Sequence, residues 1–142
     1  RTYFVGEVTD KARRLVDVTA QSFYEGIRHA CPGNRIADIS AAIQECVEKH
    51  GYSVVRKYVG HGIGREMHEA PQVPNYRARE RGPRLEPGMT LAVEPMVNEG
   101  HYNIKLLDNR WTVVTADGSL SAHYENTIAV TSGEPVILTK LE

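Results

Sequence analysis

The sequence has few cysteines, almost no net charge and no long apolar run. Two cysteines, Cys31 and Cys46, are too few for a disulfide scaffold, and they favour a reducing compartment such as the cytoplasm. The 17 Lys+Arg and 18 Asp+Glu residues leave a formal charge of −1, without the positive footprint of a nucleic-acid or membrane-surface binder. No apolar run approaches the roughly 18–20 residues that span a bilayer, and no signal-like segment leads the chain.

The remaining composition is typical of a folded protein. Hydrophobic residues make up 41% of the chain and charged residues 25%, as in soluble globular domains. A length of 142 residues suits one domain, so we expect a single domain over residues 1–142. The chain starts at Arg1 and continues into β-branched and aromatic residues 2–5, which predict a strand.

Two amphipathic helices are predicted in the first third of the sequence. Thr9 is suited to cap the first helix, whose apolar positions recur every fourth residue at Leu15, Thr19, Phe23 and Ile27. Asn34 is the expected N-cap of the second helix, which should end before Gly51. The buried stripe of this second helix is expected to contain Ile36, Ile39, Ile43, Cys46 and Val47.

After the second helix the sequence pattern becomes strand-like. The proline-rich residues 69–88 predict a long ordered loop, and Asp108-Asn109 and Asp117-Gly118 are hairpin signals. Strands are predicted over residues 52–58, 89–94, 111–115, 121–131 and 135–138. The predicted fold class is α+β, with two long helices on an antiparallel sheet.

Three polar side chains occupy positions where a purely structural sequence would carry none. Glu94 ends an apolar strand and Glu125 lies within another, where a buried carboxylate is costly unless a charge or a metal compensates it. The period of two places Glu125 with His123 and Thr127 on one face of its strand. His61 stands between two glycines, so the backbone can approach closely and the imidazole is unobstructed.

Each of these residues also has an ordinary structural interpretation. A strand glutamate is more often solvent-facing than functional, and a histidine between glycines can be a simple loop residue. One histidine and two carboxylates on separate elements also suit a site for Mn, Fe, Co or Zn. The HExxH pattern of the zincins is absent, because no second histidine follows His68-Glu69 at the required position.

Four motifs follow one another along the chain. They are Gly60-His-Gly-Ile-Gly64, His68-Glu-Ala-Pro71, Glu94-Pro-Met96 and Ser119-Leu-Ser-Ala-His-Tyr-Glu125. In this combination the chain resembles the type I methionine aminopeptidases, closely and over its whole length. The sizeable C-terminal insertion of the type II relatives does not fit into this sequence, which favours type I.

The resemblance implies a pita-bread fold that holds two divalent cations (Co, Mn, Fe or Zn) through two aspartates, one histidine and two glutamates. Three of these ligands map onto His61, Glu94 and Glu125, with Glu125 bridging the cations. The two aspartates would precede Arg1, so we expect the chain to be the C-terminal portion of such an enzyme. Without its missing N-terminal part, the isolated chain is expected to be inactive.

The resemblance also implies a reaction. Enzymes of this family remove the initiator methionine from nascent proteins, by attack of a metal-bridging hydroxide on the first peptide bond. The glutamate matching Glu94 moves the proton, and the histidine matching His68 binds the substrate and stabilises the tetrahedral intermediate. Met67 and Trp111 match positions that line the methionine pocket, although type I members commonly have phenylalanine in place of Met67.

Two other functions stay open at this point. An X-Pro aminopeptidase or dipeptidase of the same fold shares the ligand set, and some pita-bread relatives are non-catalytic binding proteins. The expected partners are N-terminal methionine peptides of nascent chains, with no membrane and no specific nucleic acid. A basic stretch is a candidate contact to the ribosome, although interspersed glutamates favour a solvent-exposed loop; its arginines are Arg77, Arg79, Arg81 and Arg84.

Overall fold

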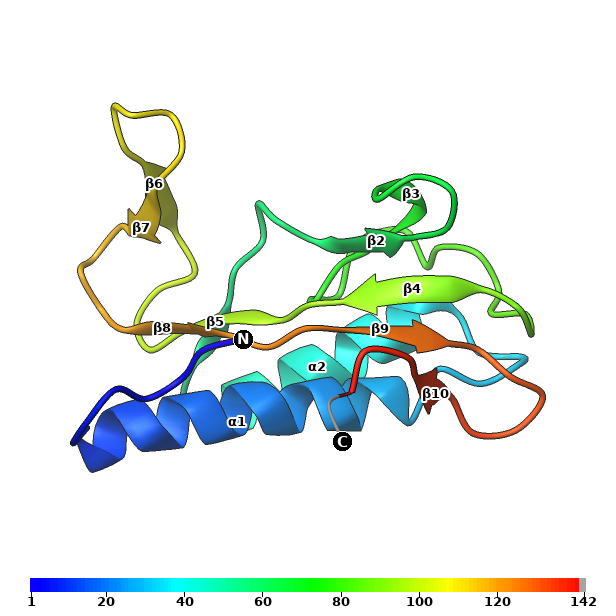
Figure 1. Cartoon of the computed structure of the whole chain (residues 1–142), viewed down its shortest axis with the longest axis horizontal. Coiled ribbons are helices and arrows are strands. Elements are labelled where there is room, and N and C mark those ends of the chain that lie inside the picture. Colours follow the sequence, from blue (N-terminus) through cyan, green and yellow to red (C-terminus); the bar gives the residue numbers. More distant parts are fainter. Residues whose placement is uncertain (141–142) are drawn as a thin grey trace.

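Two α-helices lie side by side and cover one face of the strands (Figure 1). This arrangement comes from a computed structural model that describes residues 1–140. The helices are α1, Asp10–Ile27, and α2, Ile36–Lys49, close to the predicted positions. Within the described residues, neither helix combines the length and the apolarity needed to cross a membrane.

Helix α1 begins and packs as its sequence pattern predicts. The Thr9 hydroxyl accepts a hydrogen bond from the Ala12 N–H at 3.2 Å, which satisfies one of the free donors of the first turn. The predicted stripe is buried at all of its positions: Leu15, Thr19, Phe23 and Ile27. Gly26 lies on the same side, where a Cβ atom would come within 2.5 Å of Ile43, so the glycine permits close packing of α1 on α2.

Helix α2 begins one residue later than the sequence predicts. The N-cap is Arg35 rather than Asn34, because the Asp38 carboxylate accepts a hydrogen bond from the Arg35 N–H at 2.7 Å. The Asn34 carbonyl instead accepts from the Leu85 N–H at 2.9 Å, which ties the helix start to a distant loop. The predicted stripe of α2 is buried at every position: Ile36, Ile39, Ile43, Cys46 and Val47.

The strands form antiparallel sheets, so the predicted α+β class is confirmed. The larger sheet has the order β10-β9-β4-β2-β3, with bounds Val136–Ile137, Asn126–Ala129, Thr90–Val93, Gly60–Gly62 and Glu69–Val73. The smaller sheet has the order β1-β5-β8, with bounds Ser53–Val54, Met96–Asn98 and Ser121–His123. A hairpin of β6, Ile104–Leu106, and β7, Val113–Thr115, projects from one end of the molecule (Figure 1).

The chain crosses between the two sheets twice, and the two crossings lie side by side. Strand β4 leads into β5 across Glu94-Pro95, and β8 leads into β9 across Tyr124-Glu125. The Tyr124 N–H donates to the Pro95 carbonyl at 3.2 Å, so the two crossing segments stay paired between the sheets. Both predicted carboxylates therefore lie in one short junction.

The main hydrophobic core fills the space between the helices and one face of the larger sheet. Side chains of β4 and β9 pack there against the apolar stripes of both helices, and they include Leu91, Val93 and Ile128. Alternate residues of the same strands face away from the helices. The core thus leaves the opposite sheet face available for polar side chains.

Two predicted segments differ from the structure in type. Residues 2–5 are not a strand: Thr2 alone bonds to a neighbouring strand, exchanging hydrogen bonds of 2.9 Å with His123, and no ladder continues from there. The predicted loop 69–88 contains strand β3, which pairs with β2. Its Pro71 is accommodated because β3 lies at the sheet edge, where a missing N–H breaks no ladder.

The other predicted strands are present but shorter. Residues 52–58 form a strand only over β1, and 111–115 and 135–138 are reduced to β7 and β10. The predicted strand 121–131 is divided into β8 and β9 by the change of sheet. Asp108-Asn109 lies in the β6–β7 hairpin as predicted, whereas Asp117-Gly118 joins strands of different sheets. Local turn signals do not specify which strands pair.

We predict that Gly60→Ala destabilises the protein by about 1–3 kcal/mol, the usual cost of overpacking. A Cβ atom at Gly60 would lie 2.2 Å from the backbone carbonyl oxygen of Ala92, which belongs to the paired strand β4 and cannot easily move. Gly133→Ala is the matched control, because its Cβ would meet only Thr131 at 3.9 Å and should change stability by less than about 0.5 kcal/mol. Urea denaturation measures both; equal effects would contradict the steric explanation.

Candidate metal centre

His61 lies on strand β2 with its ring orientation set by a backbone contact. Its Nδ1 lies 2.8 Å from the Gly62 carbonyl oxygen; since a carbonyl only accepts, Nδ1 carries the proton. In the neutral ring the other nitrogen, Nε2, presents a lone pair, and it lies 3.3 Å from Glu94 Oε1. A histidine held in this way is typical of metal ligands, whose second nitrogen is bonded to a carbonyl or carboxylate.

The flanking glycines explain how His61 comes so close to its neighbours. A Cβ atom at Gly62 would lie 2.2 Å from the Ala70 carbonyl oxygen of strand β3. A Cβ atom at Gly60 would meet Ala92 on the other side of β2. Strand β2 is therefore tightly enclosed between β3 and β4, and only residues without side chains fit beside His61.

Cross-strand register brings the two predicted glutamates together. Val93 of β4 pairs with Asn126 of β9, so the next residues outward are Glu94 and Glu125. His61 pairs with Ala92, two residues before Glu94, and therefore shares its sheet face. The Glu94 side chain is largely buried and that of Glu125 is more exposed, at 15% and 44% of their full accessibility.

The electrostatics of this cluster favour an added positive charge. The pKa of Glu94 is raised to about 7, mainly by burial and also by the neighbouring Glu125 carboxylate, while His61 opposes the shift. Two carboxylates that face each other across strands repel one another. A divalent cation between them would compensate both charges.

His123 is the residue of this site to which sequence reasoning assigned no role. Its Nε2 lies 3.9 Å from Glu94 and 3.8 Å from Glu125, and it is buried without a hydrogen-bond partner. Burial lowers the pKa of His123, which favours the neutral ring that binds metals. The available signal was its position two residues before Glu125, which places both side chains on one strand face.

The donors of this cluster fit a divalent metal. One atom each of Glu94, His123 and Glu125 lie within 4.8 Å of one another. Imidazole and carboxylate together suit Mn, Fe, Co and Zn. The orphaned nitrogen of His123 is a further sign of fit, because buried polar atoms normally have a partner.

His68 lies next to His61 in space. Their ring centroids are 4.2 Å apart, and His68 is exposed at the end of the turn between β2 and β3. The Glu69 carboxylate shapes this turn by accepting from the Glu66 N–H at 2.8 Å. His68 is therefore placed beside the candidate metal ligands with its ring accessible to a substrate.

The two residues predicted to line a methionine pocket are both exposed. Met67 is 71% exposed in the turn beside His68, and Trp111 is 87% exposed in the β6–β7 loop. A mostly apolar hollow of about 680 Å³ lies between the hairpin and the smaller sheet, but neither residue lines it. Within residues 1–140, Met67 and Trp111 do not form an enclosed pocket, and their role stays a prediction.

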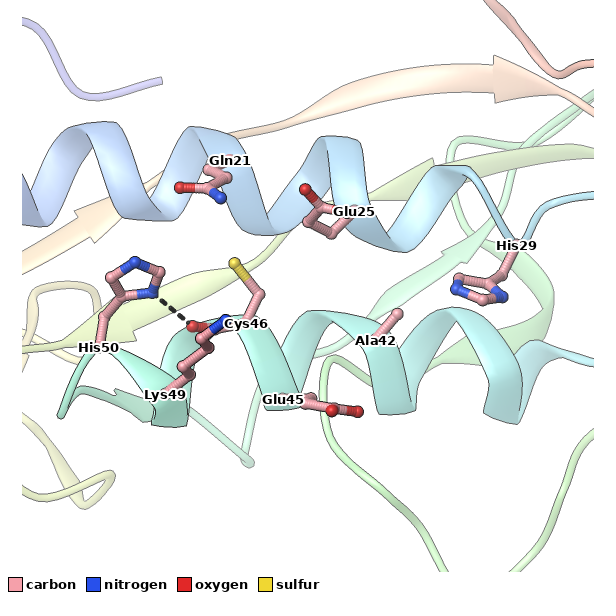
Figure 2. A pocket seen from close by; sticks show the side chains of 8 residues that line it. All are labelled: Gln21, Glu25, His29, Ala42, Glu45, Cys46, Lys49 and His50. Atoms are coloured by element: carbon pink, nitrogen blue, oxygen red, sulfur yellow. Dashed lines mark hydrogen bonds between the residues drawn. The ribbon is translucent and has the colours of Figure 1, made fainter.

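A polar hollow of about 350 Å³ lies between α1 and α2, away from the candidate metal ligands (Figure 2). The Cys46 sulfur points into it from α2, near Glu25 of α1. Burial raises the pKa of the Cys46 thiol, and Glu25 adds to this, so the sulfur stays protonated. None of the predicted site residues lines this hollow, and its cysteine is not an activated nucleophile.

Comparisons with known proteins define the class to which this fold and site belong. Residues 1–132 match the model of metallopeptidase family M24, and the chain belongs to this family. It is 57% identical over 142 residues to the methionine aminopeptidase of Clostridium acetobutylicum, covering all of this chain and 57% of that relative. It is 51% identical to methionine aminopeptidase 1 of Bacillus subtilis, covering 99% of this chain and 56% of that relative.

Solved structures of similar proteins share the fold. A methionine aminopeptidase from Thermotoga maritima superposes with a TM-score of 0.94 at 48% identity, covering 98% of this chain and 56% of that one. A prolidase from Pyrococcus furiosus, at 23% identity, shares the fold with a TM-score of 0.76 over all of this chain and 36% of its own. The expected pita-bread fold is thus confirmed. The chain spans little more than half the length of the methionine aminopeptidases that it matches.

In the absence of metal, we expect Glu94→Gln to raise the free energy of unfolding near pH 8 and to change it little near pH 4. The folded carboxyl of Glu94 stays protonated up to about pH 7, whereas an unfolded glutamate ionises near pH 4.3. Between these values the native state binds the extra proton, so this group lowers stability as the pH rises. Because glutamine does not ionise, the variant does not lose stability through this group as the pH rises.

Urea denaturation in EDTA at both pH values measures this difference. Glu134→Gln is the control, because Glu134 is exposed and its side chain makes no contact among the described hydrogen bonds and ion pairs. An equal effect of Glu94→Gln at the two pH values would show that the raised pKa is not expressed in the folded protein.

Proposed function

We propose that this chain forms part of a metal-dependent aminopeptidase that removes the N-terminal initiator methionine from nascent proteins. The observation that carries the proposal is that His61 of β2 lies 3.3 Å from Glu94, directly after β4, and that register places Glu125, directly before β9, opposite Glu94. Relatives about half identical to the chain, which cover it almost entirely, are named methionine aminopeptidases. Protein synthesis supplies such substrates in the cytoplasm, where we expect the protein to act.

Two divalent cations would be held by His61, Glu94 and Glu125, with Glu125 as the bridging ligand. The remaining two aspartate ligands would come from residues outside this sequence. We therefore expect the 142-residue chain alone to lack peptidase activity. A bound cation supplies Lewis-acid chemistry, which activates water and polarises the carbonyl that it attacks.

The chain's own groups would handle the proton and the developing charge. Glu94 is largely buried and its pKa is raised to about 7, which suits a carboxylate that accepts and returns a proton near neutral pH. His68 stands 4.2 Å from His61, ring to ring, where it can donate a hydrogen bond to the oxygen of the scissile carbonyl. Such a donor acts most strongly in the transition state.

Met67 and Trp111 are proposed to contact the methionine side chain once the rest of the enzyme encloses them. Both present large apolar surfaces to solvent in residues 1–140, so both are accessible to a ligand or to another segment of the enzyme. A thioether can adapt to another thioether in such a pocket. Contact with the ribosome through the exposed 77–84 loop is part of the same proposal.

That loop also has contacts within the chain. The guanidinium of Arg77 lies 3.6 Å from Glu45, and that of Arg81 lies 3.6 Å from Asp38, so both charges are partly balanced by α2. The arginines at 79 and 84 have no such ion pair among the described residues. A ribosome contact would therefore rely mainly on these two.

We predict that His61→Ala or Glu125→Ala abolishes the metal-dependent release of methionine from Met-Ala-Ser. The test uses the longer protein that supplies the remaining ligands, with metal content measured in parallel. The 142-residue chain should give no release at all. Turnover by either variant at saturating metal would contradict the ligand assignment. Cleavage of Ala-Pro in place of Met-Ala-Ser would identify an X-Pro peptidase instead, and a metal-free, inactive protein would indicate a binding role.

His68→Ala should lower kcat by about two to four orders of magnitude while the metal content stays unchanged, because the lost hydrogen bond acts mainly in the transition state. His29→Ala, at an exposed position beyond the end of α1, is the matched control and should retain full activity. Steady-state kinetics on a Met-Ala-Ser peptide separate the effects on kcat and KM. An unchanged kcat would leave His68 with a structural role only.

A further inference from the structure

His123 has a rigid backbone and a side chain directed at the two glutamates. It is the last residue of β8 and pairs with Met96 of β5. Its N–H donates to the Thr2 hydroxyl, and its carbonyl accepts from the Thr2 N–H, both at 2.9 Å. The backbone is thus bonded on both edges, and the imidazole is held on the face that carries Glu125.

The distances from His123 Nε2 to the two carboxylates are too long for hydrogen bonds and match those between two ligands of the same cation. Its Nε2 lies 3.9 Å from Glu94 Oε2 and 3.8 Å from Glu125 Oε2. Hydrogen bonds of this kind are about 2.7–3.2 Å long. Two ligands of one cation, each bonded at about 2.1 Å, lie about 3–4.2 Å apart depending on their angle. The observed separations fall within that range.

The state of the His123 nitrogen supports the same conclusion. Nε2 is buried and has no hydrogen-bond partner among the described residues. Buried polar atoms of native proteins almost always have a partner. One oxygen each of Glu94 and Glu125 lies within 4 Å of Nε2, and one cation between them would also satisfy the nitrogen.

We propose that His123 Nε2 is an additional metal ligand, which shares a divalent cation with Glu94 and Glu125. This inference rests on the proposed metal centre and adds a donor to the histidine and two glutamates already assigned. The two oxygens of Glu94 face different histidines, since Oε1 lies 3.3 Å from His61 and Oε2 lies 3.9 Å from His123. Glu94 thereby connects two imidazole-containing halves of the site.

The extra imidazole has two chemical consequences. The cation gains one imidazole and two carboxylates from this chain alone, and three protein ligands are the usual number at a zinc site that keeps one position open. The imidazole also favours Zn, Fe or Co over the harder cations Mg and Ca, which prefer oxygen. The 142-residue chain is therefore expected to bind Zn²⁺ on its own, although it is not expected to hydrolyse peptides.

The test measures Zn²⁺ binding to the complete 142-residue chain by titration calorimetry. His123→Gln retains an amide of similar size but removes the imidazole, and we expect the Kd to rise by about tenfold or more. His29→Gln is the matched control, since it removes an exposed histidine outside the site and should bind as the wild type does. A Kd for His123→Gln within twofold of the wild-type value would overturn the proposal.

A second measurement does not depend on a variant. In the wild-type chain labelled with ¹⁵N-histidine, added Zn²⁺ should move the Nε2 resonances of both His61 and His123 to positions typical of metal-bound nitrogen. Movement of His61 alone would overturn the role of His123 and leave the metal centre intact. If Zn²⁺ does not bind at all, both this inference and the idea of a metal site held by the chain's own residues are overturned.

Discussion

The repulsion between two closely placed carboxylates is the constraint around which this site is organised. Glu94 and Glu125 lie opposite each other, directly beyond the last paired residues of β4 and β9, and Glu94 is largely buried. The protein alone relieves this strain by keeping a proton on Glu94, whose pKa is raised to about 7. In the proposed metal centre, bound divalent cations would relieve it more completely, because they would balance both charges and accept the nitrogens of His61 and His123.

The surrounding fold brings these four side chains close together, although they come from different strands and junctions. The two helices take up the apolar face of the larger sheet, so the opposite face is left for polar groups. Glycines on both sides of His61 allow β2 to lie against the backbones of β3 and β4. The buried Asn75 side chain donates to the Glu94 carbonyl at 3.1 Å and anchors the chain where β4 ends. Hydrogen bonds from distant residues thus hold the junction between the sheets.

Most predictions from local sequence signals succeeded, although the N-cap of α2 is Arg35 rather than Asn34. Thr9 caps α1, both apolar stripes are buried, and the ordered motifs indicated a family that the comparisons confirm. Prediction from the sequence failed where pairing decides the outcome. Residues 2–5 have strand-forming side chains but lack a ladder, and the proline-containing β3 is a strand because an edge position tolerates Pro71.

The same division applies to the site. Residue type made His61, Glu94 and Glu125 possible ligands, since imidazole and carboxylate have fixed chemical preferences for metals, and the family resemblance carried by the ordered motifs predicted that role for them. Only the tertiary structure could place His123 among them. Its nitrogen approaches both carboxylates because β4 passes into β5 and β8 into β9 at the same level. That register depends on packing between residues distant in sequence, which local periodicity does not encode.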